Sequence, residues 1–535
     1  MNQSPDKKNR RMPRPLLVWL AAFILVAVAI ALVTLTKQIA TLQNLYWGSI
    51  LSTSFVVTTA PVLLWVSLRW ACMRRNWGRA LVGLAGLATL FAIFYLEEDW
   101  RGKRAWENCK RELEAKGAVL DWNKFIPPPV PDDQNFFAAP KMQDWFTGRG
   151  MRDLSTRLQS TNYNNLTTSV GGKNLITNAE VAKVYLAWSD QFAPDFNLIH
   201  EALKRPYARM DGDYSQPFEI PIPNFLTERI VAQVLSQRAH CYFLLNEPEK
   251  ALGELTFLND SRRLLEGAPT GKPMTLVAAM INVAVAGLYV NTVADGFQRH
   301  AWPEQRLIVL QKQLAEVNLA PFVLQALQEA PASACRDAEI LPLYQLMNFG
   351  RTPKWPDKIG SWLWPRGWTY QNMVNVAVLE LRPLDGFDLA HDTVAPRRFD
   401  ESARDIDMFF RHKSPYKILA AIAIPNFSKA EQTTAHNQTL ANEAQIVCAL
   451  ERYRLAHGEY PEKLDALVPQ FIEKVPHDII GGAPLIYRAL PDGKFLLYSI
   501  GLNETDDGGQ DGGNDFTIGD CVWKNQPQMN TDSHR

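Results

Sequence analysis

The sequence predicts an integral membrane protein: three N-terminal transmembrane helices, then a mostly α-helical, repeat-like soluble domain, then a small α+β domain. Three observations predict this fold class. Long uncharged apolar runs lie within the first hundred residues, helical spacing of apolar residues dominates the middle of the chain, and β-rich runs with turn residues follow near the C-terminus. At 535 residues, the chain is also too long for one compact domain.

The apolar runs are residues 16–36, 38–68 and 80–96. Each can cross a hydrocarbon core of about 30 Å, and each should be helical because backbone groups in lipid must be satisfied internally. The first run is longer than the apolar core of a signal peptide, and no small-residue cleavage site follows it. We therefore expect uncleaved transmembrane helices over residues 15–97, after a basic tail at 1–14.

Positive charge sets the expected orientation. Basic residues precede the first apolar run and lie between the second and third, at Lys7, Lys8, Arg10, Arg11, Arg14, Arg69, Arg74, Arg75 and Arg79. Such segments stay in the cytoplasm, so an odd number of spans places the rest of the chain on the outer side. Three basic residues after the third run oppose this orientation: Arg101, Lys103 and Arg104.

A fourth uncharged run, residues 273–294, is also long enough to span a membrane. Asn282 and Asn291 interrupt it, and its small residues suit close packing between helices. Because a helix that is apolar on all sides fits either environment, a fourth span is the alternative. We expect a buried core helix.

Composition and motifs exclude several functions. The 56 basic and 56 acidic residues give zero net charge, which argues against nucleic acid as a partner. The sequence has no H-E-x-x-H, Walker, dinucleotide-binding or G-x-S-x-G motif, so no catalytic residue is predicted. His240 and Cys241 are interpreted as core positions rather than a nucleophile pair, because adjacent helical residues point apart by about 100°.

Residues 98–140 are expected to form a juxtamembrane helix and a Pro-rich linker. The run at residues 127–131 is either a stiff spacer or an extended strap packed along the next domain.

Residues 141–413 are expected to form an α-helical soluble domain. Within it, residues 225–265 form a helical hairpin that breaks before Pro248. The hairpin resembles a single tetratricopeptide repeat, with small residues, Ala239 and Ala251, where the helices cross closely. Helical-repeat domains of this kind usually bind or scaffold rather than catalyse.

A segment rich in Trp, Pro and Gly, residues 355–370, contains Trp355, Trp362, Trp364 and Trp368. We interpret it as a loop. Its aromatic rings can stack on sugars or rest on a lipid surface. We expect instead that they fold onto the helical domain, because large aromatic residues are mostly buried on average.

The C-terminal residues 414–523 have a recognisable order of elements. A long helix is predicted from Ile418 to about His457, and Asp492-Gly493 is a hairpin turn before a strand at 495–500. The order resembles the globular head of the major pseudopilins of type II secretion systems, which are pilin-like. The resemblance covers residues 416–523 and rests on the motifs Ala-Ile-Pro-Asn-Phe, His-Gly-Glu-Tyr-Pro and Tyr-Ser-Ile-Gly.

The module departs from that family in being internal, with basic residues just upstream of an apolar run too short to span a membrane. The resemblance therefore implies the fold of the head and not pilus assembly. In the pseudopilins the final loop binds calcium. Here that loop offers oxygen ligands on a glycine-rich backbone: Asn503, Asp506, Asp507, Asp511 and Asp515. The alternative is an ordinary solvated turn. Residues 524–535 are expected to be a disordered tail.

We therefore expect a non-enzymatic, multi-pass protein of the bacterial inner membrane, with a cytoplasmic N-terminus and a periplasmic C-terminal bulk. Its partners would be the lipid bilayer and envelope or secretion proteins, which the helical and pseudopilin-like domains bind or scaffold; nucleic acid is not expected. No cofactor other than Ca²⁺ is expected. The alternative is an envelope hydrolase or glycan-binding protein that uses the Trp355–Trp368 loop.

Overall fold

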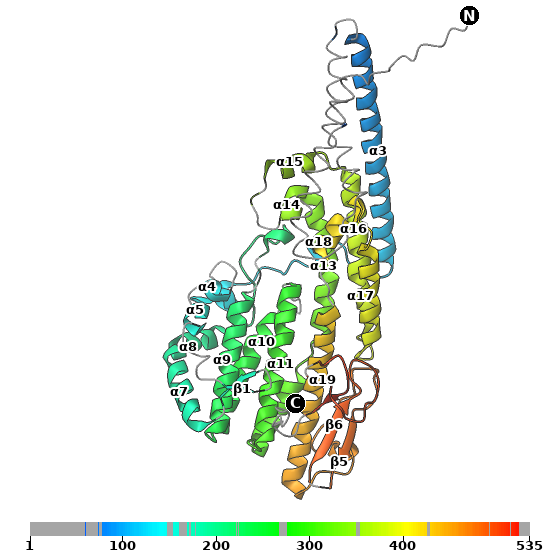
Figure 1. Ribbon diagram of the computed structural model, residues 1–535. Coiled ribbons are helices and arrows are strands. Elements are labelled where there is room, and N and C mark those ends of the chain that lie inside the picture. The colour runs from blue at the N-terminus through cyan, green and yellow to red at the C-terminus, as the bar shows by residue number, and fades with distance from the viewer. Residues whose placement is uncertain are drawn as a thin grey trace, which may run out of the picture. The chain divides into compact units, whose positions relative to one another are not determined.

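The structure, a computed structural model, describes residues 59, 73, 77–146, 154–159, 168–170, 173–176, 178–220, 222, 224–266, 275–348, 352, 354–424, 428–491, 493–513 and 515–523. Contacts divide the chain into two compact units, Met1–Glu97 and Glu98–Arg535, and each is described by itself. The described residues are mostly helical, with a small strand-containing region near the C-terminus (Figure 1). The predicted membrane runs 16–36 and 38–68, one residue aside, and the predicted tail 524–535 lie outside the described residues.

Helix α3, Trp77–Ala115, contains the third predicted membrane run. Its most apolar window has a mean hydropathy of 1.9, and none of that window is buried. Two other described stretches are long and apolar enough to span a membrane, Leu276–Gln298 and Glu304–Ile340, but 61% and 50% of their windows are buried. Contiguous exposed apolar surface calls for an apolar neighbour, so among the described helices only α3 has the surface expected of a membrane span.

The juxtamembrane helix is not separate from the predicted span, because α3 is one continuous helix of 39 residues. It ends at Ala115, where Gly117 takes a left-handed conformation with φ of 93°. The Ala118 N–H then donates to the Leu113 carbonyl at 3.0 Å, which closes the last turn.

The Pro-rich segment after α3 forms a strap with both ends anchored on one later segment. The Trp122 indole donates to the Tyr214 carbonyl at 2.7 Å, and the Phe136 N–H donates to the Tyr207 carbonyl at 2.7 Å. These contacts agree with the packed-strap alternative. The strap contains three short 3₁₀ helices: η2 Trp122–Lys124, η3 Asp132–Gln134 and η4 Phe136–Ala138.

Short elements precede the central helices: α4 Met142–Phe146, α5 Leu154–Gln159, α7 Ala179–Ser189, η5 Asp190–Phe192, α8 Ala193–Ala202, η6 Pro217–Glu219 and an antiparallel pair, β1 Thr168–Val170 and β2 Lys173–Leu175.

The predicted helical hairpin is present as α9, Phe225–Leu244, and α10, Pro248–Arg263. Asn246 makes the turn with φ of 58°. Ala239 and Ala251 are fully buried, which allows the two helices to approach closely at these positions.

Helix α11, Leu276–Gln298, packs against α9 and α10 on one side and against the later helix α19 on the other. Gly287 of α11 lies so close to Asn437 that a Cβ atom there would collide with the Asn437 amide. The burial of α11 matches the core helix expected for residues 273–294. The next elements are η7 Leu264–Glu266, α12 Glu304–Ala315 and α13 Ala320–Ile340.

A second helical group follows: α14 Leu343–Asn348, α15 Trp355–Trp362, α16 Arg366–Leu381, η8 Arg382–Gly386, β3 Phe387–Asp388, β4 Thr393–Val394, α17 Pro396–Phe410, η9 Pro415–Lys417 and α18 Ile418–Ala423. The segment 355–370, predicted as a loop, is therefore mostly helical. Pro356 lies in the first turn of α15 and Pro365 at the N-cap of α16. A proline at these positions interrupts no helical hydrogen bond.

The predicted C-terminal helix is divided into α18 and α19, Ser428–His457. The division follows from Ile424, which precedes a proline and is extended, with φ of −93° and ψ of 99°. After η10, Leu464–Leu467, three antiparallel strands form a sheet in the order β5-β6-β7: Ile486–Ala489, Phe495–Ser499 and Cys521–Val522.

Helix α19 lies between α11 and this sheet (Figure 1). Its buried residues, among them Val447 and Leu450, belong to the same hydrophobic core as Val283 of α11 and Leu310 of α12. Residues 141–413 and 414–523, which the sequence analysis assigns to two domains, therefore share one core.

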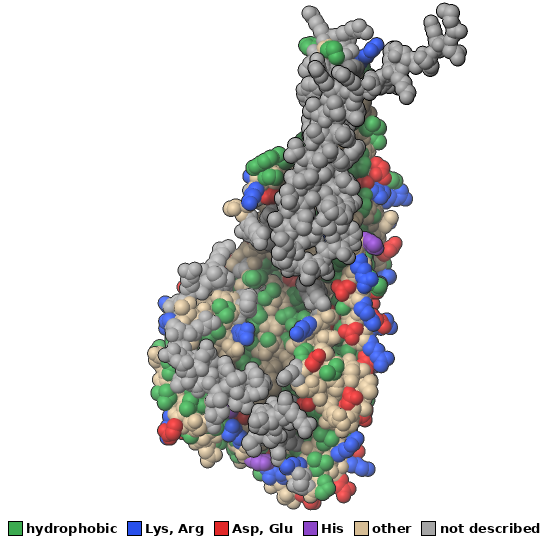
Figure 2. All heavy atoms as spheres, in the orientation of Figure 1, with side chains coloured by type: hydrophobic (Ala, Val, Ile, Leu, Met, Phe, Trp, Pro, Cys, Tyr) green, Lys and Arg blue, Asp and Glu red, His purple; other side chains and the backbone are tan. Residues whose placement is uncertain are grey.

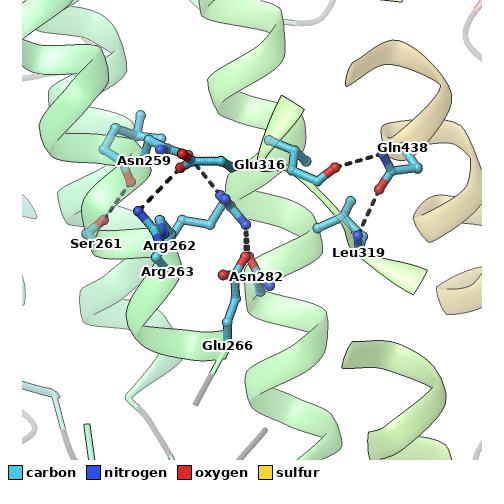
Figure 3. Close-up of polar contacts among 11 residues, drawn as sticks. Asn259, Ser261, Arg262, Arg263, Glu266, Asn282, Glu316, Leu319 and Gln438 are labelled. Carbon is cyan, nitrogen blue, oxygen red and sulfur yellow. Dashed lines mark hydrogen bonds and ion pairs between the residues drawn. The ribbon is translucent and has the colours of Figure 1, made fainter. Parts of the chain in front are cut away.

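Polar residues buried between these helices fix their positions (Figure 3). Arg262 of α10 is fully buried; its guanidinium donates to Asn259 at 3.2 Å and to Asn282 at 3.0 Å, and it pairs with Glu266. The Gln438 side-chain amide of α19 accepts a hydrogen bond from the Leu319 N–H at 2.8 Å. It also donates a hydrogen bond to a backbone carbonyl in the same turn. This amide joins α19 to the turn between α12 and α13.

Candidate functional site

A polar cavity of about 930 Å³ lies where α9, α11 and α19 meet the loop between β6 and β7. Its volume is in the range of ligand sites in proteins. Polar side chains from all four segments line it: Arg229, Gln233, Gln237, His240, Asn291, Asp295, Gln298, His436, Asn437, Asp511, Asp520 and Cys521. The cavity therefore exists only because α19 packs onto α11.

An apolar groove adjoins the cavity along α9 and α11. It has a volume of about 660 Å³ and is lined mainly by Leu276, Val277, Met280, Ile281 and Val285. Four residues line both spaces, Arg229, Gln233, Ala284 and Leu288. The cavity and the groove, together called the α9–α11 groove, therefore adjoin each other, and polar side chains line the first while mainly apolar side chains line the second.

His240 is part of the wall rather than a free base. Its Nε2 contacts the Ile176 carbonyl at 2.8 Å, and its Nδ1 contacts the Asp295 carboxylate. Because both ring nitrogens are engaged by these neighbours, the imidazole is held in place by the fold. Arg299 also contacts Asp295, at 3.4 Å.

Cys241 points away from this pair into an apolar cluster and is fully buried. Burial raises the pKa of its thiol to about 12. His240 and Cys241 are therefore separate structural residues, as the helical geometry predicted.

A thiol and an imidazole do meet elsewhere in the cavity. Cys521 Sγ of β7 lies 3.6 Å from His436 Nδ1 of α19, and the His436 ring packs on Phe516 with centroids 4.9 Å apart. Such a pair has the composition of a cysteine nucleophile with its base. Sequence reasoning missed this pair because its members are 85 residues apart, and no local spacing signals it.

Four of the five predicted calcium ligands make side-chain hydrogen bonds within the C-terminal module. Asp506 accepts from the Tyr498 hydroxyl at 3.0 Å, Asn503 donates to Asp507 at 2.8 Å, and Asp515 accepts from the Thr517 hydroxyl at 2.6 Å. Asp511 lines the cavity. In the part of the chain that the structure describes, no three His, Cys, Asp or Glu residues are grouped to hold a metal ion, and calcium binding stays a prediction.

Asp520, which the sequence analysis did not select, organises this loop. Its two carboxylate oxygens accept hydrogen bonds from the Asp507 N–H at 3.1 Å and the Gly509 N–H at 2.6 Å. It precedes Cys521 directly, so the same carboxylate that shapes the loop also positions the strand bearing the cavity thiol.

The four predicted tryptophans divide into two pairs. Trp364 and Trp368 pack edge to face with ring centroids 5.0 Å apart, and the Trp364 indole donates to Thr369 at 3.1 Å. Trp355 and Trp362 are 75% and 81% exposed. The expectation that these aromatics fold onto the helical domain is thus correct for the first pair and wrong for the second.

Comparison with known proteins gives no match: no protein-family model, no curated protein and no solved structure is similar to this chain. The α9–α11 groove and the exposed surface are therefore the features from which function can be inferred.

Proposed function

We propose that the chain is a non-enzymatic protein of the bacterial inner membrane that binds a segment of an envelope or secretion protein in the α9–α11 groove. Its helical region resembles a tetratricopeptide hairpin and its C-terminal module a pseudopilin head, and both would face the periplasm. The position of the polar cavity directly beside the apolar groove is the observation that carries the proposal.

The chemistry of the groove suits a peptide. A helical or extended segment places apolar side chains along one face, which Val277, Met280 and Ile281 would cover. Its polar groups would meet amides such as Gln237 in the cavity. On the face shown in Figure 2, Lys and Arg side chains are interspersed with Asp and Glu. That mixture is unlike the basic stripe of a nucleic-acid-binding protein.

The test is a matched pair of substitutions at exposed alanines. Ala284→Trp fills the groove, and Ala187→Trp on α7 adds the same side chain elsewhere on the surface. Tagged proteins would be crosslinked in cells, purified from gently solubilised membranes and identified by mass spectrometry. We expect wild type and Ala187→Trp to retain a common partner that Ala284→Trp loses.

If Ala284→Trp retained the partner at the wild-type level, the α9–α11 groove would not be the binding site. A lone monomer in every sample would refute the binding function. Equal melting temperatures for the two variants serve as the folding control, because both alanines are exposed.

An envelope hydrolase is the second candidate function. The Cys521–His436 pair, and not the tryptophan segment, would be its active site. Trp355 and Trp362 line neither the cavity nor the groove. A thiol-directed acyl probe tests this reading: labelling of wild type that is lost in both Cys521→Ser and His436→Ala would support a nucleophile.

A further inference from the structure

We propose that α15 is an interfacial helix that lies in the headgroup region of the lipid bilayer. The inference rests on the membrane anchoring in the proposed function and adds a second contact with lipid.

Helix α15 presents an apolar face that is largely exposed. Trp355, Ile359, Trp362 and Leu363 are 75%, 49%, 81% and 53% exposed. Their spacing of four, seven and eight residues places them on one side of a helix. Asp357 lies on the other side, where its carboxylate accepts a hydrogen bond from the Lys354 N–H at 2.8 Å.

Contacts within the second unit join the segment after α15 to the first residues of that unit. Gly367, in the first turn of the following helix α16, donates its N–H to the Asp99 carboxylate at 2.6 Å. The backbones of Gly367 and Gly102 lie in close contact, because a Cβ atom on Gly102 would collide with the Gly367 carbonyl. Asp99 and Gly102 directly follow the apolar run 80–96 in the sequence.

Aromatic and polar contacts hold this region in place. Trp368 packs on Tyr416 with ring centroids 6.1 Å apart, and the Tyr416 hydroxyl donates to the Glu98 carboxylate at 3.0 Å. The few residues between α15 and Gly367 therefore connect the apolar face to a rigid base that includes the first residues of the second unit.

The chemistry of α15 fits lipid better than a sugar or a protein. Tryptophans favour the headgroup level of a bilayer, and short helices with an apolar face and flanking lysines lie in that plane. Lys354 and Lys358 are exposed next to the apolar face, where they can meet lipid phosphates. A sugar site would instead need a concave surface with converging polar groups.

The experiment places a photoreactive benzoylphenylalanine at Leu90, Trp362 or Val184 of the full chain, one position at a time. Leu90 reports on the apolar part of α3, and Val184 is an exposed apolar control on α7. Each protein is reconstituted into vesicles of phosphatidylethanolamine and phosphatidylglycerol, irradiated and analysed by mass spectrometry. We expect lipid adducts from the probes at Leu90 and Trp362 and none from the probe at Val184.

The other outcomes separate the two proposals. Adducts from Leu90 without any from Trp362 would overturn the interfacial role of α15 and leave the membrane anchor intact. No adduct from Leu90 would overturn the anchor, and with it both proposals. Chain-to-chain adducts at Trp362 would show that the exposed face is a contact between copies of this protein, which also overturns the lipid assignment.

Discussion

Glu380 of α16 provides a direct test of how burial controls stability in this fold. Its side chain is 3% exposed, and one of its carboxylate oxygens has no hydrogen-bond partner among the described residues. Burial raises the pKa of this carboxyl to about 8. At neutral pH the group is therefore mostly protonated in the folded protein and ionised in the unfolded chain.

The size of the effect follows from proton linkage. The pKa of Glu380 rises from 4.5 in the unfolded chain to about 8 in the fold. Protonating this carboxyl on folding therefore lowers the unfolding free energy by about 3 kcal/mol at pH 7 and by about 1 kcal/mol at pH 5. The sign is that of an acid with a raised pKa: its contribution is most favourable below pH 4.5 and is lost as the pH rises towards 8. Lowering the pH from 7 to 5 should thus raise the unfolding free energy by about 2 kcal/mol through this group.

The substitution Glu380→Gln keeps the shape and removes the titration. We expect it to stabilise the protein by as much as about 3 kcal/mol at pH 7 and by about 2 kcal/mol less at pH 5. Chemical denaturation of the full chain in detergent, at both pH values, measures this difference between variant and wild type. Glu401→Gln is the control, because Glu401 is exposed and its weak ion pair with Arg398 should contribute little.

Since the readout is the difference between Glu380→Gln and wild type at two pH values, other titrating groups cancel. A difference that does not change between pH 7 and pH 5 would show that Glu380 is ionised in the fold, contrary to this reasoning. Glu431 of α19, whose pKa burial also raises to about 8, should give the same pattern.

Three further outcomes are expected. Asp507→Ala and Asp511→Ala should lower the melting temperature only when calcium is present; equal melting temperatures of wild type in calcium and in chelator would end the calcium prediction. Reporter enzymes fused at Gly117 and after Arg535 should both report the periplasm, and a cytoplasmic signal from the second would place the C-terminal module inside the cell. Arg262→Ala should destabilise by about 3–5 kcal/mol in thermal or chemical unfolding, because it leaves a buried carboxylate without its charge partner; a loss below about 1 kcal/mol would contradict this.

The sequence predicts those helices and strands that depend on neighbouring residues, such as helical periodicity and turn sequences. The α9–α10 hairpin follows from helical periodicity on both sides of Asn246 and Pro248, and the structure places the break there. Strand β6 follows from an apolar run after a turn sequence. The exposed apolar surface of α3 also agrees with the span expected from composition alone.

Features that depend on packing between distant segments could not be predicted from neighbouring residues in the sequence. Asn437 and Gln438 look like solvent-facing residues of an amphipathic helix, but both are buried against α11 and the turn before α13. That packing merges the C-terminal module into the helical core and forms the cavity. Helix α15 was missed because its prolines and glycines signal a loop, although Pro356 occupies the first helical turn, where proline is favoured.

The burial of α11 by α19 has a consequence for synthesis. About 130 residues separate the end of α11 from the start of α19, so at about 5–20 residues per second the ribosome needs roughly 7–26 s before it begins the covering helix. Throughout that interval a segment apolar enough to enter a bilayer lacks its final partner. Under the proposed periplasmic placement of the second unit, α11 would meet the insertion machinery in this unprotected state. Correct folding would then require that its passage across the membrane be faster than its lateral release into lipid.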